Sequence, residues 1–308
     1  MKKTAFIFPG QGSQSIGMGK DFYDASDIAK DMVSNASDAI GVDFKSLLFE
    51  ENDKLEQTQY TQPAILLVSS IAHKLFEDAQ NIKPVFALGH SLGEFSALVS
   101  VGALDYVDGV KLVHQRGKLM QEACEGKNAG MMALIGLDDE TVEKLTQEAR
   151  EAGKEVWAAN YNSNGQIVAA GNRDDLKSME SIFKEAGAKR ALLLNMSVAS
   201  HCPILTPALE PLKQSLQEVL KDSFLAPVVS NVTAQKYSTK DEAIKLLPEQ
   251  LIKPVLYKQS IEKFDSEIDL FIEFGGSVLK GLNRRGTKKP TISITNMTTL
   301  LSAFDEIK

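Results

Sequence analysis

Short apolar runs alternate with longer segments of mixed polarity along this chain. The runs at 4–8, 85–88 and 270–273 are mainly apolar, and a glycine follows each of them within two positions. Such short continuous runs are typical of strands that are buried on both faces of a parallel sheet. We expect two more strands over 228–230 and 291–295. Because helical segments separate these runs, the pattern predicts an α/β fold with a parallel sheet.

Turn and capping residues indicate where the helices between these strands begin and end. We expect a helix over 18–40 and another over 62–81, which has a proline in its first turn. A third helix is predicted to begin after Asp105, a suitable N-cap, and to run to Cys124. Further helices are expected over 203–221, 240–251 and 257–264.

A different pattern follows the polar break at 125–130. Strand, helix, strand, strand, helix and strand are predicted in this order, over 131–136, 138–152, 156–161, 166–170, 172–186 and 189–194. This order is the signature of a ferredoxin-like unit. The sequence therefore predicts a discontinuous body, 1–127 and 197–308, with a ferredoxin-like insert at 128–196.

The composition is that of an ordinary globular protein, with 43% hydrophobic and 24% charged residues in a chain of 308. No segment approaches about 20 uninterrupted apolar residues, so no membrane span is expected. The apolar run at 4–8 is too short for a signal sequence and is interpreted as the first strand. These observations predict a cytoplasmic protein.

Cysteine usage and net charge narrow the possible partners. The only cysteines are Cys124 and Cys202, without a Cys-x-x-Cys motif, which argues against a disulfide framework and against a structural zinc, and no metal site is expected. The net charge of −7 does not attract nucleic acid, and an acidic partner would need a local basic surface.

The most informative motif is Gly89-His90-Ser91-Leu92-Gly93, between a predicted strand and a predicted helix. G-x-S-x-G in this context is typical of a nucleophile elbow, in which a sharp turn exposes the serine hydroxyl. The helix that follows places free backbone N–H groups where an oxyanion would form. Glycines also close strands before helices without any chemistry, so this alternative stays open.

A nucleophilic serine needs a base, and the chain has four histidines: His73, His90, His114 and His201. The first and third lie within predicted helices and the second adjoins Ser91, so we expect structural roles for these three. His201 lies in a predicted loop, where catalytic groups are common, although it could be a satisfied loop histidine. Cys202 is interpreted as a packing residue. No carboxylate is well placed to orient His201, so a dyad oriented by a carbonyl or amide group is as plausible as a triad.

The glycine turn Gly10-Gln11-Gly12 follows the first strand. It does not fit a nucleotide-binding motif, because Ser15 replaces the third glycine of G-x-G-x-x-G and Met18 the lysine of a P-loop. A backbone N–H at this sheet edge could complete an oxyanion hole, or the segment could be only a tight turn.

Arg116 lies on the predicted helix that ends at Cys124, among apolar residues. An arginine on an apolar helix face is unfavourable without a partner. The partner could be a substrate carboxylate bound through two hydrogen bonds, or an internal Asp or Glu.

Together, these motifs resemble the malonyl-CoA:acyl-carrier-protein transacylases of fatty acid synthesis and the related acyltransferase domains of polyketide synthases. The resemblance covers nearly the whole chain. It rests on Phe8-Pro9-Gly10-Gln11-Gly12-Ser13-Gln14, Thr61-Gln62-Pro63-Ala64, Gly89-His90-Ser91-Leu92-Gly93-Glu94, Arg116-Gly117, Asn162-Ser163 before Gly165-Gln166, Ser200-His201, and Gln250-Leu251 with Pro254-Val255.

The resemblance implies an α/β-hydrolase-like body with a ferredoxin-like insert, and it assigns roles to individual residues. Ser91 would be the acylated nucleophile, His201 its base, and Gln250 would orient His201 through its main-chain carbonyl. The backbone N–H groups of Gln11 and Leu92 would form the oxyanion hole, and Arg116 would bind the malonyl carboxylate. The implied substrates are malonyl-CoA and the phosphopantetheine thiol of acyl carrier protein, with no bound cofactor.

Two other functions fit parts of the pattern. A serine hydrolase or thioesterase would share the elbow but release the acyl group to water, and a non-catalytic module would only bind coenzyme A or carrier protein. The densest basic cluster of the chain consists of Lys280, Arg284, Arg285, Lys288 and Lys289. This basic cluster is a hypothetical docking surface for acidic carrier protein, or a solvated face.

Overall fold

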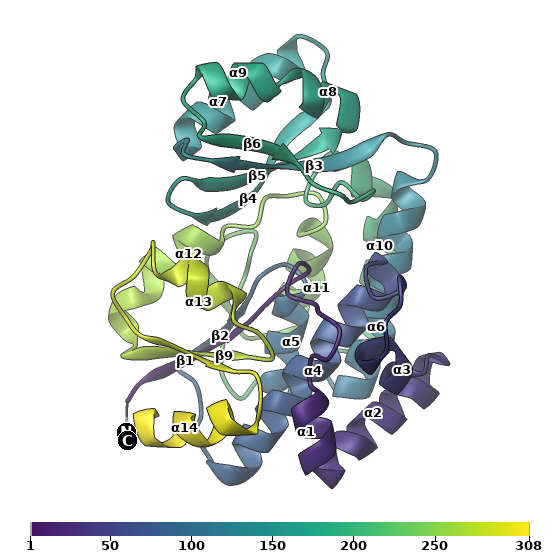
Figure 1. Ribbon diagram of the computed structural model, residues 1–308, viewed down its shortest axis with the longest axis vertical. Coiled ribbons are helices and arrows are strands. Elements are labelled where there is room, and N and C mark those ends of the chain that lie inside the picture. The colour runs from purple at the N-terminus through teal and green to yellow at the C-terminus, as the bar shows by residue number, and fades with distance from the viewer. Residues whose placement is uncertain (1, 308) are drawn as a thin grey trace.

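The computed structural model describes residues 2–307, which form two separate β-sheets (Figure 1). The strands of the larger sheet are β1 (Thr4–Phe8), β2 (Phe86–Gly89), β7 (Val228–Val229), β8 (Lys236–Tyr237), β9 (Leu270–Phe274) and β10 (Thr291–Ile294). They lie in the order β10-β9-β1-β2-β7-β8, and neighbours are parallel except β7 and β8. The predicted α/β fold with a parallel sheet is confirmed. The antiparallel edge strand β8 was not predicted.

Helices cover both faces of the larger sheet. The helices before the smaller sheet are α1 (Lys20–Ala25), α2 (Asp27–Ile40), α3 (Phe44–Phe49), α4 (Thr58–Ala79), α5 (Gly93–Ser100) and α6 (Tyr106–Cys124). Those after it are η1 (Pro203–Ala208), α10 (Leu209–Val219), α11 (Lys240–Glu249), α12 (Tyr257–Phe264), η2 (Asp265–Glu267), α13 (Val278–Asn283) and α14 (Met297–Ile307). Because side chains alternate along β1, Phe6 and Phe8 pack in one core with α4, while Ala5 and Ile7 pack in another with α12.

The helix predicted over 18–40 is in fact two helices. Ser26 has extended backbone angles and ends α1, and its hydroxyl accepts a hydrogen bond from the Ala29 N–H at the start of α2. A serine at this position competes with the helix for backbone hydrogen bonds and favours an N-cap. The helices α3 and α14 were not predicted.

The helix α4 begins at Thr58, four residues before the predicted start, so Pro63 lies inside it. A proline lacks the N–H that would bond the carbonyl four residues earlier, here that of Gln59. The Nδ1 atom of His114 on α6 lies 2.7 Å from this carbonyl oxygen and replaces the lost bond. His114 therefore has the expected structural role, which is to link α6 to α4 through this hydrogen bond.

The prediction for α6 is confirmed at both ends, and Asp105 caps it by accepting from the Val107 N–H over 2.9 Å. Gly117 allows α6 to approach α4 closely, because a Cβ atom there would lie 2.6 Å from the Cα of Gln59. This close packing fixes the position of Arg116, the neighbouring residue.

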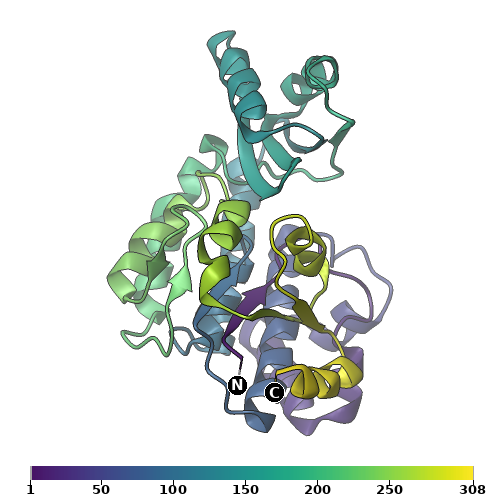
Figure 2. The same cartoon turned by 90° about the vertical axis from the view of Figure 1, so that its left-hand side faces the viewer.

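The smaller sheet is antiparallel and follows α6 in the chain. Its elements are β3 (Ala129–Ile135), α7 (Asp139–Glu151), β4 (Val156–Ser163), β5 (Gln166–Asn172), α8 (Arg173–Ser178), α9 (Glu180–Glu185) and β6 (Arg190–Leu193). The strand order is β4-β5-β3-β6, and the helices pack on one face around a core of their own. The helix predicted over 172–186 is interrupted at Met179. Figure 2 shows this sheet and its helices projecting from the larger part of the molecule.

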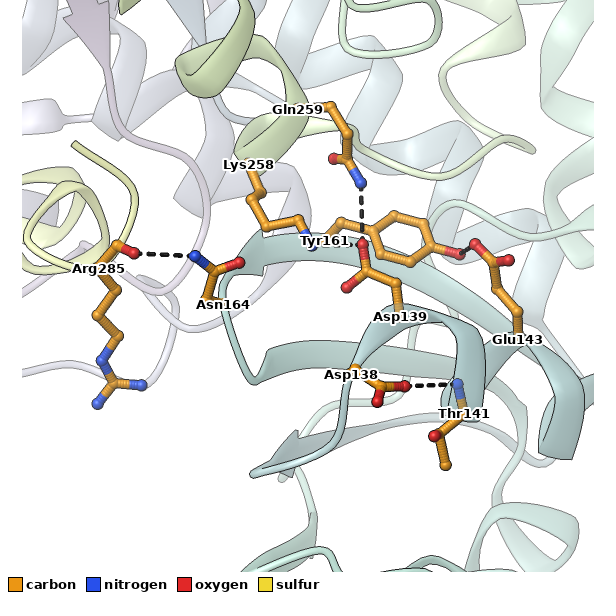
Figure 3. Close-up of polar contacts among 9 residues, drawn as sticks. All are labelled: Asp138, Asp139, Thr141, Glu143, Tyr161, Asn164, Lys258, Gln259 and Arg285. Carbon is orange, nitrogen blue, oxygen red and sulfur yellow. Dashed lines mark hydrogen bonds and ion pairs between the residues drawn. The ribbon is translucent and has the colours of Figure 1, made fainter.

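Contacts from β4 and α7 attach the smaller sheet to the segment around α12. The Tyr161 N–H donates to the Val255 carbonyl over 2.9 Å, and the Val255 N–H donates to the Ala159 carbonyl over 2.8 Å. Lys258 and Gln259 on α12 both contact the carboxylate of Asp139 (Figure 3). These contacts attach the smaller sheet to the segment that follows Gln250.

Candidate active site

The elbow predicted at Ser91 is present between β2 and α5. Ser91 has a φ of 51°, in the left-handed region that side chains other than glycine rarely adopt. A Cβ atom on Gly89 would lie 1.7 Å from the Gly93 carbonyl carbon, and one on Gly93 would lie 2.0 Å from the Phe8 oxygen. Both glycines of the motif are therefore required for the strand, the turn and the helix to pack this closely.

Ser91 and His201 meet although they are far apart in the sequence. The His201 Nε2 atom lies 2.8 Å from the Ser91 Oγ atom, and the His201 Nδ1 atom lies 2.6 Å from the main-chain oxygen of Gln250. A carbonyl oxygen only accepts, so Nδ1 must carry the ring proton of the neutral imidazole. The Nε2 atom is then free to accept the serine proton. This arrangement is the dyad alternative, since a carbonyl group orients His201.

Burial keeps the imidazole of His201 in its neutral form. His201 is 3% exposed, and this desolvation, with a smaller contribution from the charge of Arg116, lowers its pKa to about 3. At neutral pH the ring can therefore accept a proton from Ser91.

Arg116 reaches the Ser91 hydroxyl from α6 and hydrogen-bonds only uncharged groups. Its guanidinium donates to Gln62 Oε1 over 2.8 Å, to Gln250 Oε1 over 2.9 Å and to Ser91 Oγ over 3.3 Å. The internal salt bridge, one of the two expected alternatives, is not formed within residues 2–307. Burial lowers the pKa of Arg116 to about 10, so it stays protonated at neutral pH. The site thus holds a buried positive charge that lacks a direct carboxylate partner.

Gln11 and Leu92, the two residues expected to supply backbone N–H groups, line the same cavity as Ser91. Gln11 lies in the turn after β1, and Leu92 is the N-cap residue of α5. Neither N–H group has an acceptor in the described part of the chain. Two free donors beside a serine hydroxyl are the groups that an oxyanion hole requires.

Asn231 was missed in the sequence although it supports the elbow directly. Its Oδ1 atom accepts from the Ser91 N–H over 2.7 Å, and its Nδ2 atom donates to the Gly89 carbonyl over 2.6 Å. The sequence did hold one signal for Asn231. This residue follows the predicted strand at 228–230, at the carboxyl edge of the sheet, where ligand sites form in open α/β sheets.

The cavity at Ser91 has a volume of about 140 Å³ and lies between the two sheets. The lining residues contributed by the smaller sheet are Met131, Asn160, Asn162 and Val168. His90 points to this sheet, with its Nε2 atom 2.7 Å from Asn162 Oδ1. Both sheets are therefore needed to form the walls of the site.

The remaining candidates do not line the cavity at Ser91. His73 is buried against aromatic rings, including those of Phe6 and Phe274. Cys202 is buried, and its thiol contacts the Ala199 carbonyl at 3.5 Å. Both agree with the expected structural roles. In the basic cluster, Arg284, Arg285 and Lys288 are exposed, and Lys280 and Lys289 are half-buried.

Two absences apply to residues 2–307. These residues contain no group of three or more His, Cys, Asp or Glu side chains that could hold a metal ion. Their helices include none that is long and apolar enough to span a membrane.

A serine on a strained turn, in contact with a neutral imidazole, is the nucleophile of enzymes that pass acyl groups through a serine ester. Within that class, the chain belongs to the acyl transferase domain family, whose sequence pattern matches residues 5–291. It is therefore an acyltransferase.

Individual relatives match along the full length. The chain is 39% identical over 313 residues to the malonyl CoA-acyl carrier protein transacylase of Bacillus subtilis (strain 168), covering 100% of this chain and 98% of that protein. The crystal structure of the malonyl-CoA:acyl carrier protein transacylase from Helicobacter pylori is 48% identical, with a TM-score of 0.97 and coverage of 100% and 99%. A type II PKS acyl-carrier protein in complex with its malonyl-transacylase matches with a TM-score of 0.94, 34% identity and 99% coverage of both chains.

Proposed function

We propose that this enzyme transfers the malonyl group from malonyl-CoA to the phosphopantetheine thiol of acyl carrier protein in fatty acid biosynthesis. The observation that carries the proposal is the guanidinium of Arg116, which lies 3.3 Å from Ser91 Oγ with only uncharged partners. A carboxylate on the acyl group would pair with this buried charge. Relatives of this chain carry the name malonyl CoA-acyl carrier protein transacylase.

In the first half-reaction, His201 Nε2 takes the proton of Ser91 Oγ, which attacks the carbonyl carbon of the malonyl thioester. The N–H groups of Gln11 and Leu92 stabilise the oxyanion that forms. The carbon–sulfur bond then breaks, the proton passes from His201 to the departing thiolate, and coenzyme A leaves a malonyl ester on Ser91.

The second half-reaction runs the same steps in the opposite sense. His201 takes the proton of the phosphopantetheine thiol, and the sulfur attacks the ester carbonyl of malonyl-Ser91. The ester bond to Ser91 breaks, and His201 returns the proton to the serine oxygen. Gln250 keeps His201 in the required tautomer throughout, because its carbonyl accepts only from a protonated Nδ1.

We further propose that the chain has a ferredoxin-like insert within an α/β-hydrolase-like body. A ferredoxin-like insert at 128–196 is supported by the strand order β4-β5-β3-β6, with antiparallel neighbours and helices on one face. The body, 1–127 and 197–308, is proposed to be α/β-hydrolase-like because the elbow joins β2 to α5. The cytoplasm remains the expected location.

Incubation with malonyl-CoA, followed by intact-mass analysis with and without acyl carrier protein, tests the proposal. We expect one malonyl group on the enzyme alone, and its movement to the carrier protein when that protein is present. Release as free malonate faster than transfer would favour a hydrolase. Absence of any acyl adduct would favour a module that only binds.

The basic cluster is proposed to contact the acidic carrier protein. It lies beside the turn between β4 and β5, where the side chain of Asn164 donates to the Arg285 carbonyl over 3.1 Å (Figure 3). This turn follows Asn162, which lines the cavity. The exposed cations of the cluster are thus close to the wall of the site, where they could steer an acidic partner.

Reversing the charge of Arg284 and Lys288 to glutamate is expected to slow malonyl transfer to carrier protein about tenfold at low salt. Acylation by malonyl-CoA should not change, because neither side chain lines the cavity. The rates of the two half-reactions, measured separately, check this. Lys245→Glu on α11, at an exposed lysine outside the cluster, is the control. An unchanged rate and salt dependence of transfer in the double variant would contradict the docking role.

A further inference from the structure

We propose that Glu94 is a positioning residue, whose buried carboxylate turns the side-chain amide of Gln250 so that its oxygen faces Arg116. The guanidinium is thereby held where the substrate carboxylate would meet it. This inference rests on the proposed function, because it concerns how Arg116 is presented to an acidic acyl group. Glu94 is 1% exposed and lies in the first turn of α5, directly after the elbow.

Three segments donate hydrogen bonds to the carboxylate of Glu94. The Tyr237 hydroxyl on β8 donates to Oε1 over 3.0 Å, and the Asn231 N–H donates to Oε2 over 3.1 Å. The Gln250 Nε2 atom donates to Oε2 over 2.7 Å. These contacts suit an ionised carboxylate, which only accepts, and the N-terminal end of α5 favours the same negative charge.

Gln250 connects this anion to the buried cation. Its Nε2 atom faces Glu94, while its Oε1 atom accepts from Arg116 Nη2 over 2.9 Å. A carboxylate offers only acceptors and a guanidinium only donors, so one orientation of the amide satisfies both. The reversed amide would place its nitrogen against the guanidinium and its oxygen against the carboxylate. Glu94 thus acts on Arg116 through a single amide group.

The two charges also stabilise each other across Gln250. Burial raises the pKa of Glu94 to about 7, while its hydrogen bonds and the charge of Arg116 oppose this rise. Burial lowers the pKa of Arg116 to about 10, and the charge of Glu94 opposes that fall. The Gln250 Nε2 atom also donates to the Ser91 carbonyl over 3.1 Å, so without Glu94 the amide would keep this acceptor but lose its shortest hydrogen bond. The guanidinium would lose the charge that opposes its desolvation.

Glu94→Gln tests the proposal because it keeps the shape of the side chain and removes its charge. We expect the KM for malonyl-CoA to rise about tenfold, because the hydrogen bond from Gln250 would then reach a neutral acceptor and Arg116 would lose its compensating charge. The rate at which a fluorophosphonate labels Ser91 should change less than about threefold, because this probe has no carboxylate for Arg116. Steady-state kinetics and labelling kinetics provide the two measurements.

Glu273→Gln is the matched control. Glu273 is also a fully buried carboxylate, on β9, and accepts from the Leu279 and Lys280 N–H groups over 2.8 Å and 2.9 Å. It does not line the cavity. We expect this variant to lower the melting temperature and to leave the KM for malonyl-CoA unchanged.

Gln250→Met adds a test that does not depend on the folding of the Glu94 variant. It removes the connecting amide and keeps the main-chain carbonyl that orients His201. Its KM should rise as in Glu94→Gln, and the double variant should add little, because both changes break one connection. A wild-type KM in either single variant, or additive effects in the double variant, would overturn the inference. Failure of the unmodified enzyme to form malonyl-Ser91 would instead remove the proposed function.

Discussion

Replacement of Ser91 with alanine is expected to abolish the malonyl adduct on the enzyme. The Ser91 Oγ atom lies 2.8 Å from the His201 Nε2 atom that would take its proton, and alanine has no atom that can form the ester. Loss of the nucleophile should lower transfer activity at least about 10⁴-fold. Intact-mass analysis after incubation with malonyl-CoA measures the adduct, which should be stoichiometric for the unmodified enzyme and absent for the variant.

Ser96→Ala is a suitable control, since Ser96 is a buried serine of α5, the helix that follows the elbow, and its hydroxyl has no partner within residues 2–307. This variant should still acquire one malonyl group. Cys202 is a poor substitute nucleophile, because burial raises the pKa of its thiol to about 12 and the thiolate is scarce at neutral pH. A stoichiometric adduct on the Ser91 variant would therefore contradict the mechanism.

The elements that sequence could predict are those with strong local signals. The strand at Thr4–Phe8 and the helix at Tyr106–Cys124 match their predicted ranges, because a continuous apolar run and an aspartate cap define them locally. The start of α4 was wrong because Pro63 indicated a helix start. The contact that lets Pro63 lie within the helix comes from His114, on another helix. A contact of this kind has no local signature.

The residues of the site differ in the same way. Some have a local sequence signal, and others depend on contacts between segments that are distant in the sequence. Ser91 lies in a recognisable motif, whereas the environment of Arg116 depends on tertiary contacts. Its amide partners, Gln62 and Gln250, are 54 and 134 residues away in the sequence. The sequence left an internal salt bridge as an open alternative, and only the folded chain shows that neutral amides occupy those positions. Asn231 escaped notice for the same reason, since its contacts with the elbow cross 140 residues or more.

Replacement of Arg116 with alanine is expected to shift acyl selectivity from malonyl-CoA toward acetyl-CoA. A malonyl carboxylate would lose its charged partner in a buried site, which should lower kcat/KM for malonyl-CoA about 10²-fold to 10³-fold. An acetyl group has no carboxylate and does not make that interaction in either enzyme. In the alanine variant, binding of an acetyl group no longer leaves a buried guanidinium without a counter-ion. The ratio of the two kcat/KM values, measured on the same preparation, is the deciding quantity.

Arg116→Lys separates charge from geometry. Lysine keeps a positive charge but lacks the planar fork that can bind a carboxylate through two hydrogen bonds while contacting Gln62 and Gln250. We therefore expect its selectivity to lie between those of the unmodified enzyme and the alanine variant. If the alanine variant keeps the original preference for malonyl-CoA, the guanidinium does not select the acyl group. The choice of substrate would then have to come from the cavity walls, including those that the smaller sheet contributes.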